Sequence, residues 1–234
     1  MSLGIHLIFE KMKNRTLVLT LFSISMGLLE TAVVVYLRAI YYPDGFHFPV
    51  VSLSQTILVT ELWRELATLI MLATIGYMNG ETKSEKIAAF MYSFAVWDIF
   101  YYVFLKAFLN WPNSILDWDL LFLLPVPWIG PVLAPCLVSV TMILIYAIVM
   151  YKKSKGIQCK LDKTFWSLTL LGFSMVLFTF MSDSVQTLIE LSKLDSFDLL
   201  KDIRRFIPKS YNWPFFALGE IVCLFAVHKL WKQK

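Results

Sequence analysis

The chain has 234 residues, of which 58% are hydrophobic and only 16% are charged, and its mean hydropathy is +0.67. Soluble domains contain about 45–50% apolar and about 25% charged residues, so this composition predicts a membrane protein. The net charge of +4 is too small to indicate a nucleic-acid partner. The three cysteines form no C-x-x-C pair and no even-numbered set, so neither a disulfide framework nor a zinc cluster is indicated.

Apolar runs of about 20 residues predict transmembrane helices. Six such spans lie at Thr16–Tyr41, Val51–Met78, Lys86–Phe108, Trp128–Tyr151, Thr164–Leu188 and Pro214–Leu230. We therefore expect an all-α polytopic membrane protein, with residues 1–234 forming a single transmembrane domain. The first ten residues, MSLGIHLIFE, are too short for the apolar region of a signal peptide and are predicted to form a short interfacial segment.

The distribution of basic residues predicts the orientation of these spans. If the N-terminus is cytoplasmic, thirteen lysines and arginines flank the spans on the inner side and six on the outer side. Because cytoplasmic segments carry the excess of Lys and Arg, both termini are predicted to be cytoplasmic. In the outer segment Ser192–Asn212, apolar residues recur at helical spacing with charges between them, which predicts an amphipathic helix on the outer surface.

The predicted spans contain ionisable side chains, which are rare in such segments. The five carboxylates are Glu30, Glu61, Glu65, Asp98 and Glu220. A charged residue at the centre of a membrane helix costs about 2.5–3.5 kcal/mol on insertion scales, so such residues usually face the bundle interior and serve a function. At about 1.5 Å per residue, all five lie within one slab of the membrane. The nearest basic residues are Arg38 and Arg64, which would orient the acids or bind an anionic group.

Two arginines cannot neutralise five buried carboxylates. The remaining acids must be protonated, bind cations or face water. Glu61 and Glu65 are spaced i,i+4 and share one helix face, so together with Asp98 they form a candidate metal site. Its ligands would all be oxygens, which suits magnesium, calcium or manganese better than zinc or iron. The histidines lie outside the spans or at their ends, so a haem with two axial histidines is not expected.

A structural alternative is that these charges only hold helices together. Glu61 would then pair with Arg64 and Glu30 with Arg38. The other acids would stay protonated and hydrogen-bonded. The sequence leaves this alternative open beside the functional one.

Further polar residues are secondary candidates for the same site. Tyr101 and Tyr102 share a helix face with Asp98, and Asp183 lies at the outer end of the fifth span. Asp117 and Asp119 form a D-x-D pattern at the outer interface, and such a pair can hold a divalent cation that carries a phosphate. The alternative for this pair is that one of the two caps a helix.

The segment PVPWIGPVLAP, residues 125–135, interrupts the start of the fourth span with four prolines. Irregular backbone is tolerated at membrane depth only where protein buries it or where it lines a cavity. We therefore expect a short re-entrant or broken element over the outer mouth of the acidic cluster. A kinked helix start is the alternative, because proline is tolerated in the first helical turn.

The chain also resembles a known family over part of its length. Between Glu30 and Pro135 it carries TAVVVYLR, ELWRELATLIMLATIGYM, WDIFYYVFLK and WPNSILDWDLLFLLPVPWIGPVLAP. These motifs resemble those of an uncharacterised bacterial family of small polytopic membrane proteins. The resemblance implies a bacterial inner-membrane location and no particular activity or catalytic residue.

The leading functional hypothesis is an outward-accessible cavity, lined by Glu30, Glu61, Glu65 and Asp98, that binds a cation or a polar substrate. The lipid bilayer is then the main partner. One alternative is a non-catalytic subunit that packs against other membrane subunits. Another is a membrane enzyme that acts on a lipid-linked substrate at the outer leaflet, using Asp117 and Asp119.

Overall fold

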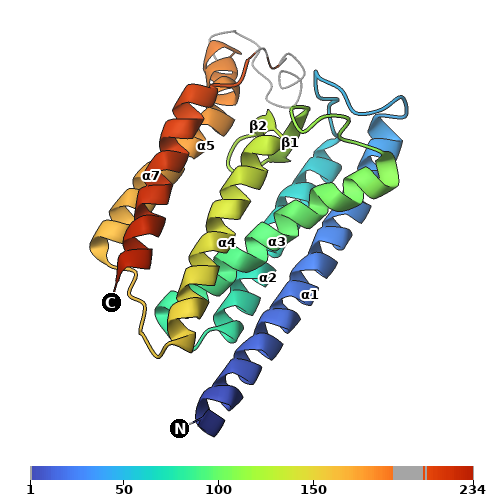
Figure 1. Ribbon diagram of the computed structural model, residues 1–234. Coiled ribbons are helices and arrows are strands. Elements are labelled where there is room, and N and C mark those ends of the chain that lie inside the picture. Colours follow the sequence, from blue (N-terminus) through green and yellow to red (C-terminus); the bar gives the residue numbers. More distant parts are fainter. Residues whose placement is uncertain (1, 192–207, 209, 234) are drawn as a thin grey trace.

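The structure is a computed structural model that describes residues 2–191, 208 and 210–233 (Figure 1). It consists of long helices and one short β-hairpin. In chain order the elements are α1 (Ser2–Tyr41), α2 (Gln55–Asn79), α3 (Lys83–Leu109), β1 (Trp118–Phe122), β2 (Trp128–Pro131), α4 (Leu133–Ser154), α5 (Lys163–Leu191) and α7 (Trp213–Lys232).

Several predicted boundaries need correction. Helix α1 begins at Ser2, so the first residues continue the first helix and do not form a separate interfacial segment. Helix α4 begins at Leu133, because the preceding residues Trp128–Pro131 form a β-strand. The fold is all-α in class, as predicted, with one short two-stranded sheet added to the helices. The amphipathic helix expected at Ser192–Asn212 falls almost entirely outside the described residues.

Polar side chains at the chain's turns fix where helices begin. The hydroxyl of Ser54 accepts a hydrogen bond from the N–H of Ile57 at the start of α2, at 3.3 Å. Thr82 does the same for Glu85 at the start of α3. Each satisfies an N–H group that the helix itself leaves unpaired. Both caps use residues directly next to the helix starts, so the local sequence specifies where α2 and α3 begin.

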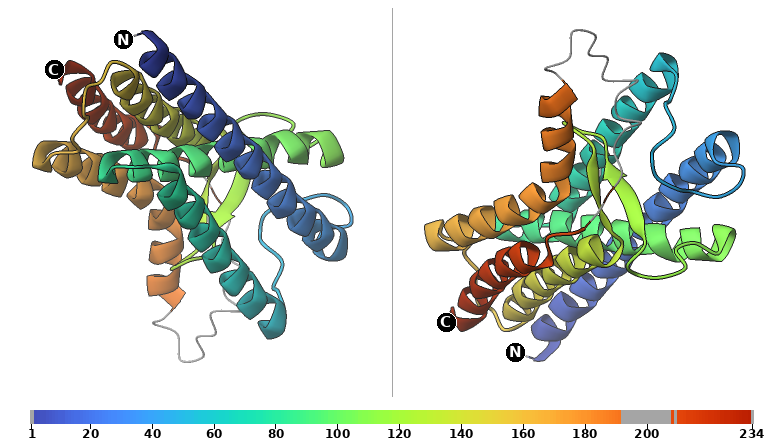
Figure 2. Two further views of the ribbon diagram at one scale, coloured as in Figure 1. Left: turned by 90° about the horizontal axis from the view of Figure 1, so that it is seen from below. Right: turned by 90° about the horizontal axis from the view of Figure 1, so that it is seen from above.

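The helices pack as an extended bundle. Helix α3 contacts α1, α2 and α4, while α5 packs mainly on α7. Strands β1 and β2 form an antiparallel hairpin that sits among the helices at one end of the bundle (Figure 2). Both chain termini lie toward the opposite end (Figure 1). The hairpin thus closes one end of the bundle.

Five helices in the described part of the chain are long and apolar enough to cross a membrane. They lie at Glu10–Tyr41, Lys83–Leu109, Leu133–Ser154, Lys163–Thr187 and Trp213–Lys232. These helices support the prediction of a multi-pass membrane protein. Helix α2, the second of the six predicted spans, is not among the five.

Helix α2 nevertheless has the burial pattern of a membrane helix. Its buried residues form one stripe: Glu61, Glu65, Thr68, Leu72 and Gly76. The exposed face carries large apolar residues, among them Val59, Trp63, Leu66, Ile70 and Met71. A water-soluble helix turns its apolar stripe inward and its charges outward. The arrangement in α2 is the reverse of this.

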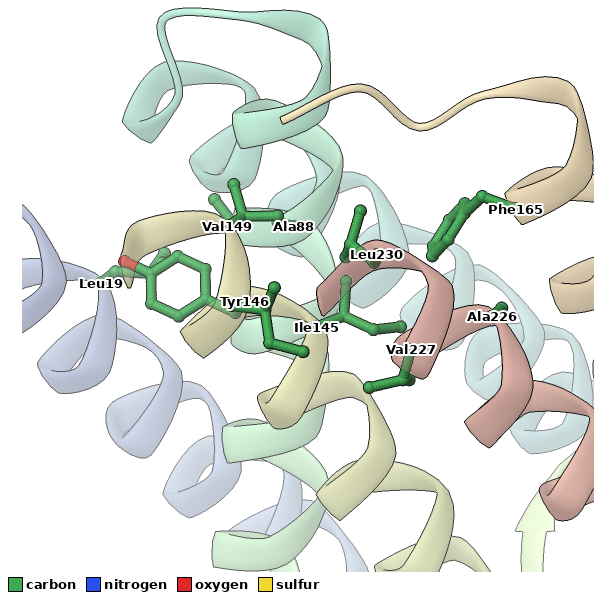
Figure 3. Packing of buried hydrophobic residues seen from close by; sticks show 11 residues of the cluster. Leu19, Ala88, Ile145, Tyr146, Val149, Phe165, Ala226, Val227 and Leu230 are labelled. Carbon is green, nitrogen blue, oxygen red and sulfur yellow. The ribbon is translucent and has the colours of Figure 1, made fainter. Parts of the chain in front are cut away.

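The apolar core is centred near the end of the bundle that carries the termini. Its largest cluster joins five helices and includes Leu19, Ala88, Ile145, Tyr146, Phe165 and Leu230 (Figure 3). Helices α5 and α7 approach closely through glycines, since a Cβ added to Gly172 would lie 2.6 Å from the carbonyl oxygen of Gly219. Such small residues allow membrane helices to pack backbone to backbone.

Ion pairs join the helix ends near the chain termini. The carboxylate of Glu81, in the turn between α2 and α3, contacts Lys11 at 3.0 Å, Arg15 at 2.9 Å and Lys153 at 2.9 Å. Lys153 also reaches Glu85. Hydrogen bonds from Lys153 and then Lys11 lower the pKa of Glu81 to about 2. This turn therefore ties α1 and α4 to α2 and α3.

We predict that Glu81→Gln removes an acid-dependent part of the stability. Because the pKa of Glu81 is lowered in the folded state, its contribution is present above its ordinary value of 4.5 and is lost as the pH falls toward about 2. The side chain is 46% exposed, so solvent screening limits the effect at about pH 7 to less than about 1 kcal/mol. Thermal unfolding in uncharged detergent across this pH range measures it. Glu10→Gln, at an exposed acid on α1, is the control, and an equal effect of both variants would contradict the prediction.

Candidate functional site

A cavity of about 670 Å³ lies within the bundle, beside the hairpin. Most of its lining side chains are apolar. Its charged lining residues are Glu30, Glu61, Glu65, Asp98, Asp119, Glu220, Arg38 and Arg64. Binding cavities for small molecules commonly combine apolar walls with a few polar groups in this way. The five carboxylates and two arginines noted in the predicted spans thus share one cavity with Asp119.

Arg64 joins α1 and α2 at the cavity wall. Its Nε donates to Oε2 of Glu61 at 2.7 Å, and its Nη1 donates to Glu30. Thr68 donates a further, longer hydrogen bond to Glu30 at 3.4 Å. One guanidinium therefore serves two carboxylates. The pairing of Glu61 with Arg64 agrees with the structural alternative, whereas the pairing of Glu30 with Arg38 is wrong.

Arg38 instead pairs with Asp119 of strand β1. Its Nη2 lies 3.0 Å from Oδ1 of Asp119, and both side chains are buried. Tyr101 donates to the other carboxylate oxygen at 3.5 Å. The guanidinium also lies over the rings of Trp111 and Phe46, at 3.9 and 4.4 Å from their centroids. This contact anchors the hairpin to the end of α1.

Glu65 connects α2 to the hairpin without an arginine. The backbone N–H of Leu123 donates to both carboxylate oxygens of Glu65, at 3.0 and 3.1 Å. Leu123 follows directly after β1, so the end of the strand supplies the donor. Within the described residues Glu65 makes no ion pair.

Helix α4 contributes two hydroxyls to the remaining acids. Ser139 donates to Asp98 of α3 at 2.8 Å, and Thr141 donates to Glu220 of α7 at 2.7 Å. The sequence reasoning had not selected Ser139 or Thr141. The signal that could have identified them is a hydroxyl residue inside an apolar span. Polar side chains of membrane helices hydrogen-bond across the bundle.

The secondary candidates separate into two groups. Tyr101 and Tyr102 line the cavity, as does Asp119. Asp117 instead accepts hydrogen bonds from the backbone N–H groups of Asn113 and Ser114, at 2.7 and 3.1 Å. The two carboxylates of the D-x-D pattern therefore have different partners. Asp183 of α5 is not among the described residues that line the cavity.

The acids of the predicted metal site, Glu61, Glu65 and Asp98, each have a partner of their own. Among the described residues, no three His, Cys, Asp or Glu side chains are grouped closely enough to hold a metal ion. Glu61 is engaged by Arg64, Glu65 by Leu123 and Asp98 by Ser139. The arrangement is better suited to a larger ligand that contacts several separated carboxylates.

The Pro125–Pro135 segment forms the second half of the hairpin and the first turn of α4. Strand β2 pairs with β1 in the register Asp119 to Gly130. Leu120–Leu124 and Trp128 line the cavity. The irregular element predicted beside the acidic cluster is a β-hairpin, which leads into α4 at Leu133.

Comparison of the chain with protein-family models, with curated proteins and with solved structures gives no match. The functional argument therefore rests on the geometry of the cavity.

Proposed function

We propose that this chain is a six-span inner-membrane protein with cytoplasmic termini, whose intramembrane cavity binds a cation or polar substrate from the outer side. The observation that carries the proposal is the single cavity lined by Glu30, Glu61, Glu65 and Asp98, which come from three different helices. Intramembrane acids that face a shared cavity are typical of ligand or ion sites.

The chain's topology supports this arrangement. Both termini lie toward one end of the bundle, which fits an even number of membrane crossings (Figure 1). The buried acidic stripe of α2 supports counting it as a span beside the five other helices. The excess of basic residues near the termini favours the cytoplasm for that end.

The charges of the cavity favour a positively charged ligand. Six carboxylates line it, and only two arginines accompany them. Arg64 and Arg38 already contact three of these acids. A cation would compensate the others, since a buried carboxylate without a partner is strongly destabilised.

The proposal predicts that small cations stabilise the protein through the cavity acids. Purified protein in uncharged detergent would be heated with sodium, potassium, magnesium, calcium or ethylammonium salts at equal ionic strength. A ligand at about 100 times its Kd adds about 2.7 kcal/mol to the free energy of unfolding. We expect such stabilisation by at least one cation, and its loss in both Glu65→Gln and Asp98→Asn.

Glu10→Gln is the matched control, because it removes an exposed carboxylate on α1 far along the chain from the cavity residues. It should keep the full stabilisation. A folded parent protein that no cation stabilises, or stabilisation that survives in both cavity variants, would contradict the proposal.

A further inference from the structure

The cavity is long as well as wide. Along α3 its lining residues run from Ile87 to Tyr102, a separation of 15 residues and about 22 Å of helix axis. The hydrocarbon core of a bilayer is about 30 Å thick. A small inorganic ion would fill only a minor part of such a space.

The two ends of the cavity differ in polarity. Toward the end of the bundle that carries the termini, the lining is apolar apart from Thr169. Its residues there include Ile87, Phe90, Met91, Phe94, Met142, Ile145, Trp166, Leu170 and Phe173. The acids lie further toward the hairpin. The shape and polarity therefore match a molecule with one charged end and one long apolar end.

The acids that lack a basic partner indicate the charge of the polar end. Glu65, Asp98 and Glu220 accept hydrogen bonds only from neutral groups, and within the described ranges none of them makes an ion pair. An ammonium group carries one positive charge and several N–H donors, so it can compensate a carboxylate and hydrogen-bond to its neighbours.

Unpaired donors face the same cavity. Nη1 of Arg38 and Nε1 of Trp97 are buried and have no hydrogen-bond partner among the described residues. Both side chains are more than nine-tenths buried, and both line the cavity. Buried donors are rarely left without a partner. An oxygen acceptor on a ligand would satisfy whichever of the two donors it lies beside.

The apolar part of the cavity includes an accessible residue. Leu170 of α5 lines the cavity, and 58% of its surface is exposed.

From these observations we infer that the cavity takes a single-chain amphiphile whose head carries a protonated amine and an oxygen acceptor. The head lies beside Asp98, and the hydrocarbon chain extends between α3, α4 and α5 toward the termini. This inference rests on the proposed function and specifies the class of its ligand.

The test compares butylamine and dodecylamine, which share the head and differ in chain length. Dissociation constants for both are measured from thermal stabilisation in uncharged detergent micelles. Met142→Trp places an indole in the apolar part of the cavity, and Leu144→Trp on the same helix alters an exposed residue outside it. Part of each amine dissolves in the micelles, which lowers its free concentration. Because this partition is the same for every variant, it does not affect the ratio of dissociation constants between two variants for the same amine.

Met142→Trp should weaken dodecylamine binding about tenfold, which corresponds to about 1.4 kcal/mol. It should leave butylamine binding unchanged. Leu144→Trp should affect neither probe, and Asp98→Asn should weaken both. Leu170→Trp, with Leu171→Trp as its exposed neighbour, repeats the comparison on α5 in case Met142→Trp does not fold.

The outcomes separate this inference from the proposed function. Suppose that Asp98→Asn weakens the binding of both amines, but that the tryptophan variants change the binding of both equally or of neither. The proposed function then stands, and the placement of the ligand's hydrocarbon chain is wrong. If Asp98→Asn leaves both amines unaffected, or a folded parent binds neither, this inference fails, and the proposed function is then decided by the inorganic cations alone. Tighter binding of laurate than of dodecylamine would overturn the assignment of a cationic head.

Discussion

Replacing Arg64 with methionine is expected to lower the free energy of unfolding by about 3–5 kcal/mol, because two carboxylates lose their shared counter-charge. Arg64 contacts both Glu30 and Glu61, and the two acids are 12% and 8% exposed at their side chains. Within the described residues neither acid has another basic partner. Equilibrium unfolding in mixed micelles of neutral detergent and dodecyl sulfate measures the change.

The control for Arg64→Met removes the two charges that the arginine serves. The triple variant Arg64→Met, Glu30→Gln, Glu61→Gln carries no uncompensated charge at this position, so it should recover most of the lost stability. Lys13→Met, at an exposed charge on α1, should change stability little. A triple variant no more stable than Arg64→Met would show that the loss comes from packing and not from unpaired charge.

The second large effect is expected at Arg38, which holds the hairpin to α1. Arg38→Met should also cost about 3–5 kcal/mol, since it leaves Asp119 buried without its partner at 3.0 Å. Arg38→Lys keeps the charge but loses the planar contact with Trp111 and Phe46, so a loss of about 1–2 kcal/mol is expected. The same mixed-micelle unfolding measures both variants.

A double-mutant cycle separates the ion pair from the ring contacts. Asp119→Asn removes the charge that Arg38 compensates. If the ion pair dominates, adding Asp119→Asn to Arg38→Met should restore part of the stability, whereas adding it to Arg38→Lys should not. Equal costs for Arg38→Met and Arg38→Lys would contradict a dominant charge effect.

The sequence identified the helices well because their signal is local. Long apolar runs and basic flanks mark a membrane helix whatever its neighbours are. The i,i+4 spacing of Glu61 and Glu65 also placed both acids on one face of α2, and that face is buried. The hairpin at Trp118–Pro131 was not predicted. Strand β2 adjoins the apolar run of α4 and was included in the predicted span Trp128–Tyr151, whereas β1 lay between predicted spans.

The pairing of the charges could not be read from the sequence. Spacing suggested Arg38 for Glu30, since both belong to α1, but Arg38 turns to Asp119, which is 81 residues away along the chain. Arg64 reaches across to Glu30 from α2. The hydroxyls of Ser139 and Thr141 likewise reach acids on α3 and α7. These contacts depend on how each helix is rotated, which hydropathy does not specify.

By itself, the sequence determined that this chain enters a membrane, roughly where its helices lie, and that its spans carry more acids than bases. These properties follow from the cost of transferring each residue into lipid, which is set residue by residue. Only the tertiary structure decided that the acids share one cavity with Asp119, that a β-hairpin lines part of it, and that an apolar arm extends from it. Those features depend on contacts between residues far apart in the chain, and the packing of complete helices fixes them.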